Sequence, residues 1–225
     1  MRHLNILLPL FAVMSVSMSC REDNGPYSDS FINYDIVIFE SQTAEEGLSF
    51  KMYLPDSDTP IIYSDVRNSI SLKNVSEGDR LLLGYMAEKG PYVSGPITVK
   101  GYNIIGNGTL AIVEGDRWLP DNYTSTGIYI YSLWRMGQYL NVHGRIVYDP
   151  SGASMNLVVS QSEMSGSACP ELNLIYGMKT PRDNYEREFY ASYDIGSLWN
   201  DESYNGFVVN VDNTNLTTNK FSFTK

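Results

Sequence analysis

Short runs of alternating apolar and polar residues recur along almost the whole chain, and this pattern limits what the chain can fold into. Successive side chains of a β-strand point to opposite faces, so period-two alternation is typical of a strand with one buried face. The runs end at Gly, Pro, Asn and Asp, which favour turns. They cover residues 34–39, 48–54, 69–72, 80–86, 97–105, 109–114, 127–134, 139–148, 154–160, 171–176, 186–193, 206–212 and 220–224. Only a single turn near residues 197–200 looks helical, so the sequence predicts an all-β protein.

A polar segment at residues 116–126 divides these runs into two groups. It contains Pro120, Asp121, Asn122 and a cluster of Ser and Thr, which together favour a loop. The strands before it are few enough for a small closed barrel of the OB type, and the larger group after it suits a sandwich. We therefore expect an N-terminal OB-like β-barrel domain at residues 34–118 and a C-terminal β-sandwich domain at residues 119–225.

The first residues have the layout of a secretory signal, in which a basic start and an apolar stretch precede small residues. Arg2 is the basic residue, residues 4–16 are the apolar stretch, and Ser17 and Ser19 precede Cys20. The apolar stretch is shorter than the roughly 20 residues that span a bilayer, which argues against a transmembrane helix. We expect residues 1–19 to be a signal peptide, Cys20 to be lipidated, and residues 20–33 to be a flexible tether.

The residues around Cys20 resemble the lipobox of bacterial lipoproteins, with Ser17 at the position where Leu is usual. Glu22 and Asp23 also resemble the acidic export signal of Bacteroidetes lipoproteins, which implies display on the cell surface. A merely charged tether is the alternative. The resemblance therefore implies an outer membrane lipoprotein, whose first partner is the membrane that holds its lipid.

The charge of the chain argues against nucleic acid as a partner, and its cysteine content argues against stabilisation by a disulfide. The chain has 16 Lys and Arg against 26 Asp and Glu, a net charge of −10. Nucleic acid is excluded as a partner because phosphate binding needs basic patches, whereas a basic peptide or protein would be attracted. With Cys20 lipidated, only Cys169 remains, so no intramolecular disulfide can form. We expect Cys169 to be a small buried apolar residue.

The sequence has no set of residues that would converge on a catalytic or metal site. His143 is the one histidine after the expected signal peptide, and alternation places it with Arg145 on the face opposite Leu140 and Val142. That face meets solvent or the neighbouring domain. The chain has no G-x-S-x-G motif and no zinc-ligand set, and its carboxylate pairs lie in turn-like segments. We therefore expect no catalytic residues, no metal, no cofactor and no enzyme activity.

The fragment at residues 106–111 fits the glycine spacing of a dinucleotide-binding turn, but a strand pattern follows it instead of a helix. Asn107 and Gly108 lie between two strand runs. The pair therefore predicts a type I′ hairpin turn.

Four aromatic residues lie on adjacent predicted strands and could stack on a sugar or a peptide. They are Tyr129, Tyr131, Trp134 and Tyr139. Alternation places Tyr129 and Tyr131 on one face of their strand. That face is either a ligand-stacking platform or part of the core.

Several short strings resemble those of the NigD-like lipoproteins of Bacteroidetes. They are residues 77–83 (EGDRLLL), 139–142 (YLNV), 171–174 (ELNL), 182–183 (RD) and 193–198 (YDIGSL). The resemblance covers most of the chain after the signal peptide and implies an OB-like domain followed by a β-sandwich. It implies an association with bacteriocin genes and an immunity role, but no catalytic residues. The relatives carry a histidine soon after the Glu-Leu strand, where this chain has Ile175, Tyr176 and Gly177, so a function of that histidine does not carry over.

These observations favour a non-enzymatic binding protein anchored in the cell envelope, whose partner is a basic peptide or protein. One alternative is a surface module that binds a glycan through exposed Tyr and Trp side chains. Another is an anchor or structural subunit of a fimbria, which is compatible with a lipoprotein that contains a β-sandwich.

Overall fold

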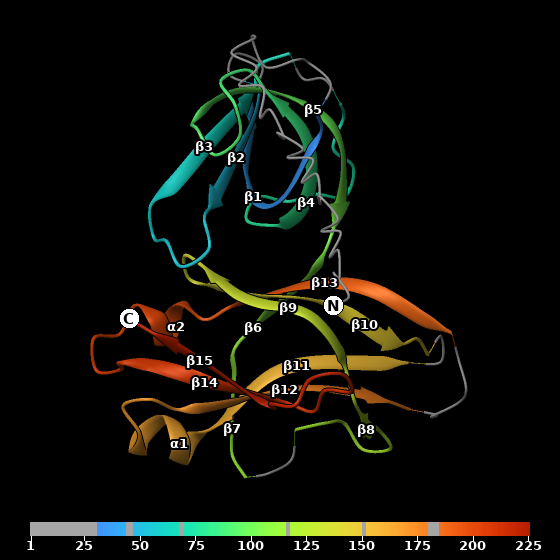
Figure 1. The fold of residues 1–225 in the computed structure, drawn as a ribbon, viewed down its shortest axis with the longest axis vertical. Helices are drawn as coiled ribbons and strands as arrows, with labels where there is room; N and C mark the ends of the chain where they lie inside the picture. Colours follow the sequence, from blue (N-terminus) through green and yellow to red (C-terminus); the bar gives the residue numbers. More distant parts are fainter. Residues whose placement is uncertain (1–30, 44–46, 68–69, 116–117, 150–151, 180–184) are drawn as a thin grey trace, which may run out of the picture.

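The all-β fold is confirmed by the computed structural model, which describes residues 31–43, 47–67, 70–115, 118–149, 152–179 and 185–225. A closed barrel lies above a two-sheet sandwich (Figure 1). The expected signal peptide, the lipidated Cys20 and most of the tether lie outside the described residues. No helix in the described ranges is long and apolar enough to cross a membrane.

Five strands close the barrel in the order β1-β2-β3-β5-β4. They are β1 (Asn33–Thr43), β2 (Gly47–Tyr53), β3 (Pro60–Asp65), β4 (Arg80–Ala87) and β5 (Gly95–Ile104). β3 and β5 pair in parallel, with Tyr63 opposite Gly95, while the other neighbours are antiparallel. Phe50, Tyr63 and Leu81 fill the interior with no exposed surface. The OB-like barrel that the sequence predicts is confirmed.

The sandwich has a four-stranded sheet, which faces the barrel, and a six-stranded sheet below it (Figure 1). The first has the order β6 (Gly106–Thr109), β13 (Glu186–Asp194), β10 (Tyr139–Val147) and β9 (Tyr129–Met136). The second has the order β15 (Lys220–Thr224), β14 (Gly206–Val211), β12 (Glu171–Met178), β11 (Ala153–Ser160) and β7 (Ala111–Val113), and β8 (Thr124–Thr126) pairs with β12. The inner faces pack around a core that includes Leu140, Leu157 and Phe207.

The structure differs from the expected domain boundary at residues 118 and 119. β6 and β7 precede that position, yet β6 pairs in parallel with β13, and β7 pairs in parallel with β11. The barrel therefore ends with β5, and Ile105 alone separates β5 from the first strand of the sandwich.

The hairpin turn predicted at Asn107 and Gly108 is wrong, because both residues lie within β6. Neither has the positive φ angle that a type I′ turn requires. A Cβ atom at Gly108 would lie 2.6 Å from the ring of Tyr193 on the paired strand. Glycine at this position thus allows an aromatic ring to approach the backbone closely. The local sequence does not distinguish such a glycine from one in a turn.

The described residues also form two short helices. α2 (Gly196–Trp199) lies where the sequence suggested a single helical turn, whereas α1 (Gln161–Gly166) was not expected. Cys169, which follows α1, is exposed, so the prediction of a buried apolar residue is wrong. The neighbouring Pro170 takes the buried position instead.

Candidate binding site

The barrel rests on the outer face of the four-stranded sheet, and a buried polar cluster joins the two. Arg80, the first residue of β4, donates hydrogen bonds from Nε to Ser192 Oγ and from Nη2 to Asn141 Oδ1, each 3.0 Å long. The exposed fractions of Arg80, Asn141 and Ser192 are 2%, 0% and 1%. Burial lowers the pKa of Arg80 to about 10, so the guanidinium is still a cation at neutral pH. We call this contact region between barrel and sandwich the seam.

A second contact at the seam joins the loop after β2 to the turn between β9 and β10. Arg135 donates from Nη1 to Asp58 Oδ1 and to Gly137 O, each at 2.6 Å. Asp56 N donates to Arg135 O, and Gly137 N donates to Ser57 O. The barrel is therefore attached to the sandwich at two separated places in addition to the chain connection at Ile105.

The four aromatic residues of the predicted stacking platform divide into two pairs. Tyr129 and Tyr131 lie together on the outer face of β9, with ring centroids 5.2 Å apart, and the guanidinium of Arg145 lies over both rings. Tyr139 lies at the seam under Arg80, 4.2 Å from its guanidinium carbon. Trp134 packs against the barrel core and donates from Nε1 to Met136 Sδ. The single platform of four rings remains a prediction, and the fold places the two pairs in different surroundings.

His143 lies on the outer face, as alternation predicted, between two tyrosine rings. Its ring stacks on Tyr190 with centroids 4.1 Å apart, and Tyr131 lies 4.7 Å away. His143 Nε2 lies 2.6 Å from Glu188 Oε1. Within the described ranges no Ser, Thr or Cys side chain hydrogen-bonds to His143, so it has no activated nucleophile beside it. No three His, Cys, Asp or Glu side chains gather into a possible metal site in the described part of the chain.

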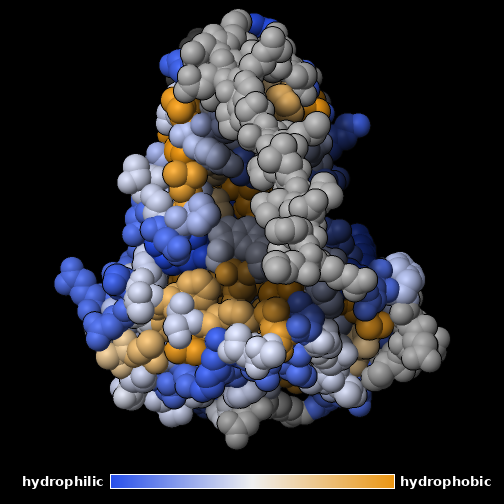
Figure 2. All heavy atoms as spheres, viewed as in Figure 1, coloured by the Kyte–Doolittle hydropathy of each residue, from blue (hydrophilic) through white to orange (hydrophobic). Residues whose placement is uncertain are grey.

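A cleft of about 760 Å³ opens where the barrel overhangs this face, and we call it the seam cleft. Figure 2 shows the surface hollowed between the barrel and the sandwich. The barrel contributes Tyr34 and Asp35 from β1 and Tyr92 from the loop before β5, and the sandwich contributes Trp134, Glu188 and Tyr190. No lysine or arginine is among the described residues that line it. The seam cleft thus combines aromatic faces with carboxylates.

Asp35 is the more buried of the two carboxylates. Burial raises its pKa above the ordinary value of 3.8, and a smaller opposing effect comes from the Tyr85 hydroxyl, which donates to Asp35 Oδ2 at 2.8 Å. The Tyr85 hydroxyl lies 3.0 Å from that of Tyr63, which accepts a hydrogen bond from Tyr92 N. Tyr92 has a φ angle of 64°, an uncommon conformation for a residue with a side chain. The network fixes both the carboxylate and the backbone that carries an exposed ring at the cleft.

Asp35→Asn is expected to make the folding stability less dependent on pH. A carboxyl whose pKa is raised in the folded state stabilises the fold when protonated, and this contribution is lost as the pH rises through the raised pKa. The free energy of unfolding of the variant should therefore match or exceed that of the native chain above that pKa. Urea denaturation of both chains between pH 4 and pH 7, roughly the window above the ordinary carboxyl pKa, tests this. A variant that is less stable than the native chain at neutral pH would contradict it.

The sequence did not indicate the seam cleft, whose lining residues come from both domains. Tyr34 and Tyr190 lie far apart in the chain and meet only because the barrel docks on one half of the sheet. Alternation predicts the face on which a side chain lies but not which domain covers that face. Asn141 and Ser192 were the available signal for docking, since they form an outward polar patch on their strands that a neighbouring domain can bury.

The structure is similar to solved structures of proteins from Bacteroides species, whereas no protein-family model and no curated protein matches the sequence. A Bacteroides vulgatus protein of unknown function has a TM-score of 0.68 and 17% identity, over 87% of this chain and 91% of that chain. A NigD-like immunity protein from Bacteroides caccae has a TM-score of 0.57 and 13% identity, over 85% and 91%. A putative lipoprotein from Bacteroides fragilis has a TM-score of 0.56 and 10% identity, over 87% and 96%. The chain therefore has the fold of a NigD-like immunity protein, as the resemblance implied.

Proposed function

We propose that the protein is a non-enzymatic lipoprotein, held at the outer membrane through lipid on Cys20, that binds a basic peptide or protein segment in the seam cleft. The observation that carries this proposal is the lining of the cleft, in which aromatic rings surround two carboxylates and no described lysine or arginine competes for them. Aromatic faces attract cations, and carboxylates pair with them.

Each part of the seam cleft has a role in the proposed binding. Tyr34 and Tyr92 are 67% and 53% exposed and can cover the hydrocarbon stem of a lysine or arginine. Glu188 has a side chain that is 59% exposed. Asp35 lies deeper, where a bound cation would offset the burial that raises its pKa. The net charge of −10 steers a basic partner toward the protein.

The fold and the expected anchor are compatible with a protective role at the envelope. One protein of the same fold is named as an immunity protein, and another as a putative lipoprotein. A basic toxin peptide captured in the seam cleft would be kept from reaching the membrane. This is the form of immunity that the proposed binding would support.

Glu188→Gln is expected to weaken binding of a short lysine-rich peptide by about tenfold, which corresponds to roughly 1.4 kcal/mol. The variant removes the exposed carboxylate but keeps the size of the side chain. Isothermal titration calorimetry of the full-length chain in mild detergent, at low and at physiological salt, measures the change. The same peptide with glutamine in place of lysine should not bind.

Glu202→Gln is the matched control, because it makes the same charge change at an exposed site outside the seam cleft. It should leave the affinity nearly unchanged. An equal loss in both variants would mean that only the overall charge attracts the peptide. That result, or equal binding of the lysine and glutamine peptides, would contradict the proposal.

A further inference from the structure

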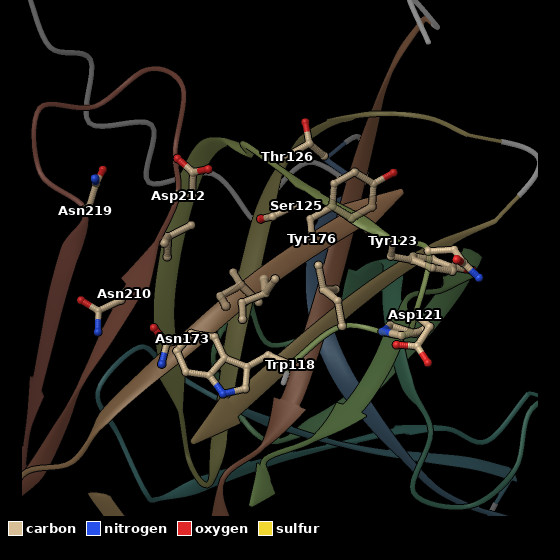
Figure 3. A pocket seen from close by; sticks show the side chains of 16 residues that line it. Trp118, Asp121, Tyr123, Ser125, Thr126, Asn173, Tyr176, Asn210, Asp212 and Asn219 are labelled. Atoms are coloured by element: carbon tan, nitrogen blue, oxygen red, sulfur yellow. The ribbon is translucent and has the colours of Figure 1, made fainter. Parts of the chain in front are cut away.

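A second cleft, of about 790 Å³, lies on the sandwich where β12 changes its hydrogen-bonding partner (Figure 3). β12 pairs with β14 over Glu171–Leu174 and with β8 over Tyr176–Met178. The segment 118–123 folds over this junction, and Leu119 packs against Gly177, where a Cβ atom would lie 2.7 Å from Leu119 Cδ1. We call this space the loop cleft.

Amide and carboxylate side chains line the loop cleft, both from β12 and β14 and from the loops that follow β14 and precede β15 and β8. Asn210, Asp212 and Asn219 lie on its left in Figure 3, Asp121 and Tyr123 lie on its right, and the half-buried Trp118 lies below. No described lysine or arginine lines the cleft. Its described lining therefore offers hydrogen-bonding groups and aromatic rings, the largest of them Trp118, without a positive charge.

Neighbouring side chains hold two of these amides in place. Asn210 donates from Nδ2 to Glu171 Oε2 at 3.0 Å, which leaves its Oδ1 free to accept. Asn219 accepts at Oδ1 from Asn213 Nδ2 at 2.8 Å, which leaves its Nδ2 hydrogens to donate. Within the described ranges, the side chains of Asn173 and Asp212 have no hydrogen-bond partner, and the buried indole N–H of Trp118 has no acceptor. The cleft thus presents both fixed and unused polar groups.

We infer that the loop cleft is a binding site for a neutral saccharide, packed against the indole of Trp118 and hydrogen-bonded by Asn173, Asn210 and Asp212. A sugar ring has apolar C–H faces and a rim of hydroxyls that both donate and accept. A flat aromatic ring beside amides and a carboxylate complements both features. The carboxylate of Asp212 disfavours an anionic sugar. A peptide cannot add here as a further strand, because this edge of β12 is already paired with β14 and β8.

This inference is independent of the cationic peptide site. The residues of the loop cleft and those of the seam cleft do not overlap. Either site can therefore fail its test without affecting the other.

The test uses an array of neutral gluco-, manno-, galacto- and xylo-oligosaccharides, followed by calorimetry with the strongest binder and the full-length chain in mild detergent. Trp118→Ala is expected to weaken binding by at least about tenfold, because it removes the indole ring that packs against the sugar and orients it. Asn173→Ala should weaken it by about threefold, because one hydrogen bond is lost at a site that does not support the core. Saccharide binding should quench or shift the tryptophan fluorescence of the native chain, and this change should be lost in Trp118→Phe.

Tyr185→Ala is the matched control, since Tyr185 is 66% exposed and lies outside both clefts. It should bind as the native chain does, and circular dichroism should show all variants folded. Tyr131→Ala tests the rival platform on β9. The inference would be overturned by binding of no neutral glycan, by binding of sulfated or uronic glycans alone, by unchanged binding in the folded Trp118→Ala and Asn173→Ala chains, or by a loss confined to Tyr131→Ala.

Discussion

Asn141→Leu should lower the free energy of unfolding by about 3 kcal/mol, because it removes one of the two side chains that accept hydrogen bonds from the buried Arg80 cation. The Asn141 side chain has no exposed surface, and its Oδ1 accepts from both Arg80 Nη2 and Ser192 Oγ. Arg80 Nη1 already has no partner among the described residues, so the cation has little to compensate a further loss. Urea denaturation of the full-length chain followed by circular dichroism measures the change.

The second half of this experiment replaces the cation as well. Arg80→Met combined with Asn141→Leu should recover much of the lost stability, since two apolar side chains of similar size can replace a buried polar pair. Asn103→Leu makes the same substitution at an exposed position of β5 and should change the stability by less than about 0.5 kcal/mol. If the double variant is no more stable than Asn141→Leu alone, the buried cation is not the cause of the loss.

Gly206→Ala should destabilise the chain by about 3 kcal/mol, because both the backbone angle and the space exclude a side chain. Gly206 begins β14 with a φ angle of 150°, and an added Cβ would overlap the carbonyl oxygen of Phe223 on β15. Relieving this overlap pushes β15 away from the sheet. The stacked rings of Phe207 and Phe223, now 4.9 Å apart, would separate.

Gly166→Ala is the matched control for this prediction. Gly166 ends α1, and an added Cβ would have no atom within 4 Å. Alanine favours a helix over glycine, so the melting temperature should stay the same or rise slightly. Scanning calorimetry of the two variants compares them directly, and a similar loss in both would show that the contact with β15 is not responsible.

The faces of the strands could be predicted from the sequence because alternation is a local property. In β10 it placed Asn141, His143 and Arg145 on one face and Leu140 and Val142 on the other, and the burial of Leu140 and Val142 in the core agrees. The number of short strands was also sufficient to predict a barrel followed by a sandwich, although the polar segment between β7 and β8 lies within the sandwich and does not separate the two domains.

The errors and omissions come from contacts between distant parts of the chain. Gly108 has the local pattern of a turn, and only the ring of Tyr193 explains why the chain stays extended there. The loop cleft could not be predicted from the sequence, because Asn173 and Asn210 become neighbours only through the parallel pairing of β12 with β14. The seam cleft likewise depends on how the barrel docks on the sandwich, and the alternation of residues in the sequence does not predict this docking.

The three attachments of the barrel to the sandwich have a consequence for recognition. Ile105, the Arg80 cluster and the Arg135 loop contact hold the barrel at separate points, which opposes its rotation as a rigid body. A ligand of the proposed site in the seam cleft would therefore meet walls that are already in position, and little conformational entropy would be lost when it enters. The width of the cleft opening would then be fixed, so the size of a side chain would decide whether it can enter.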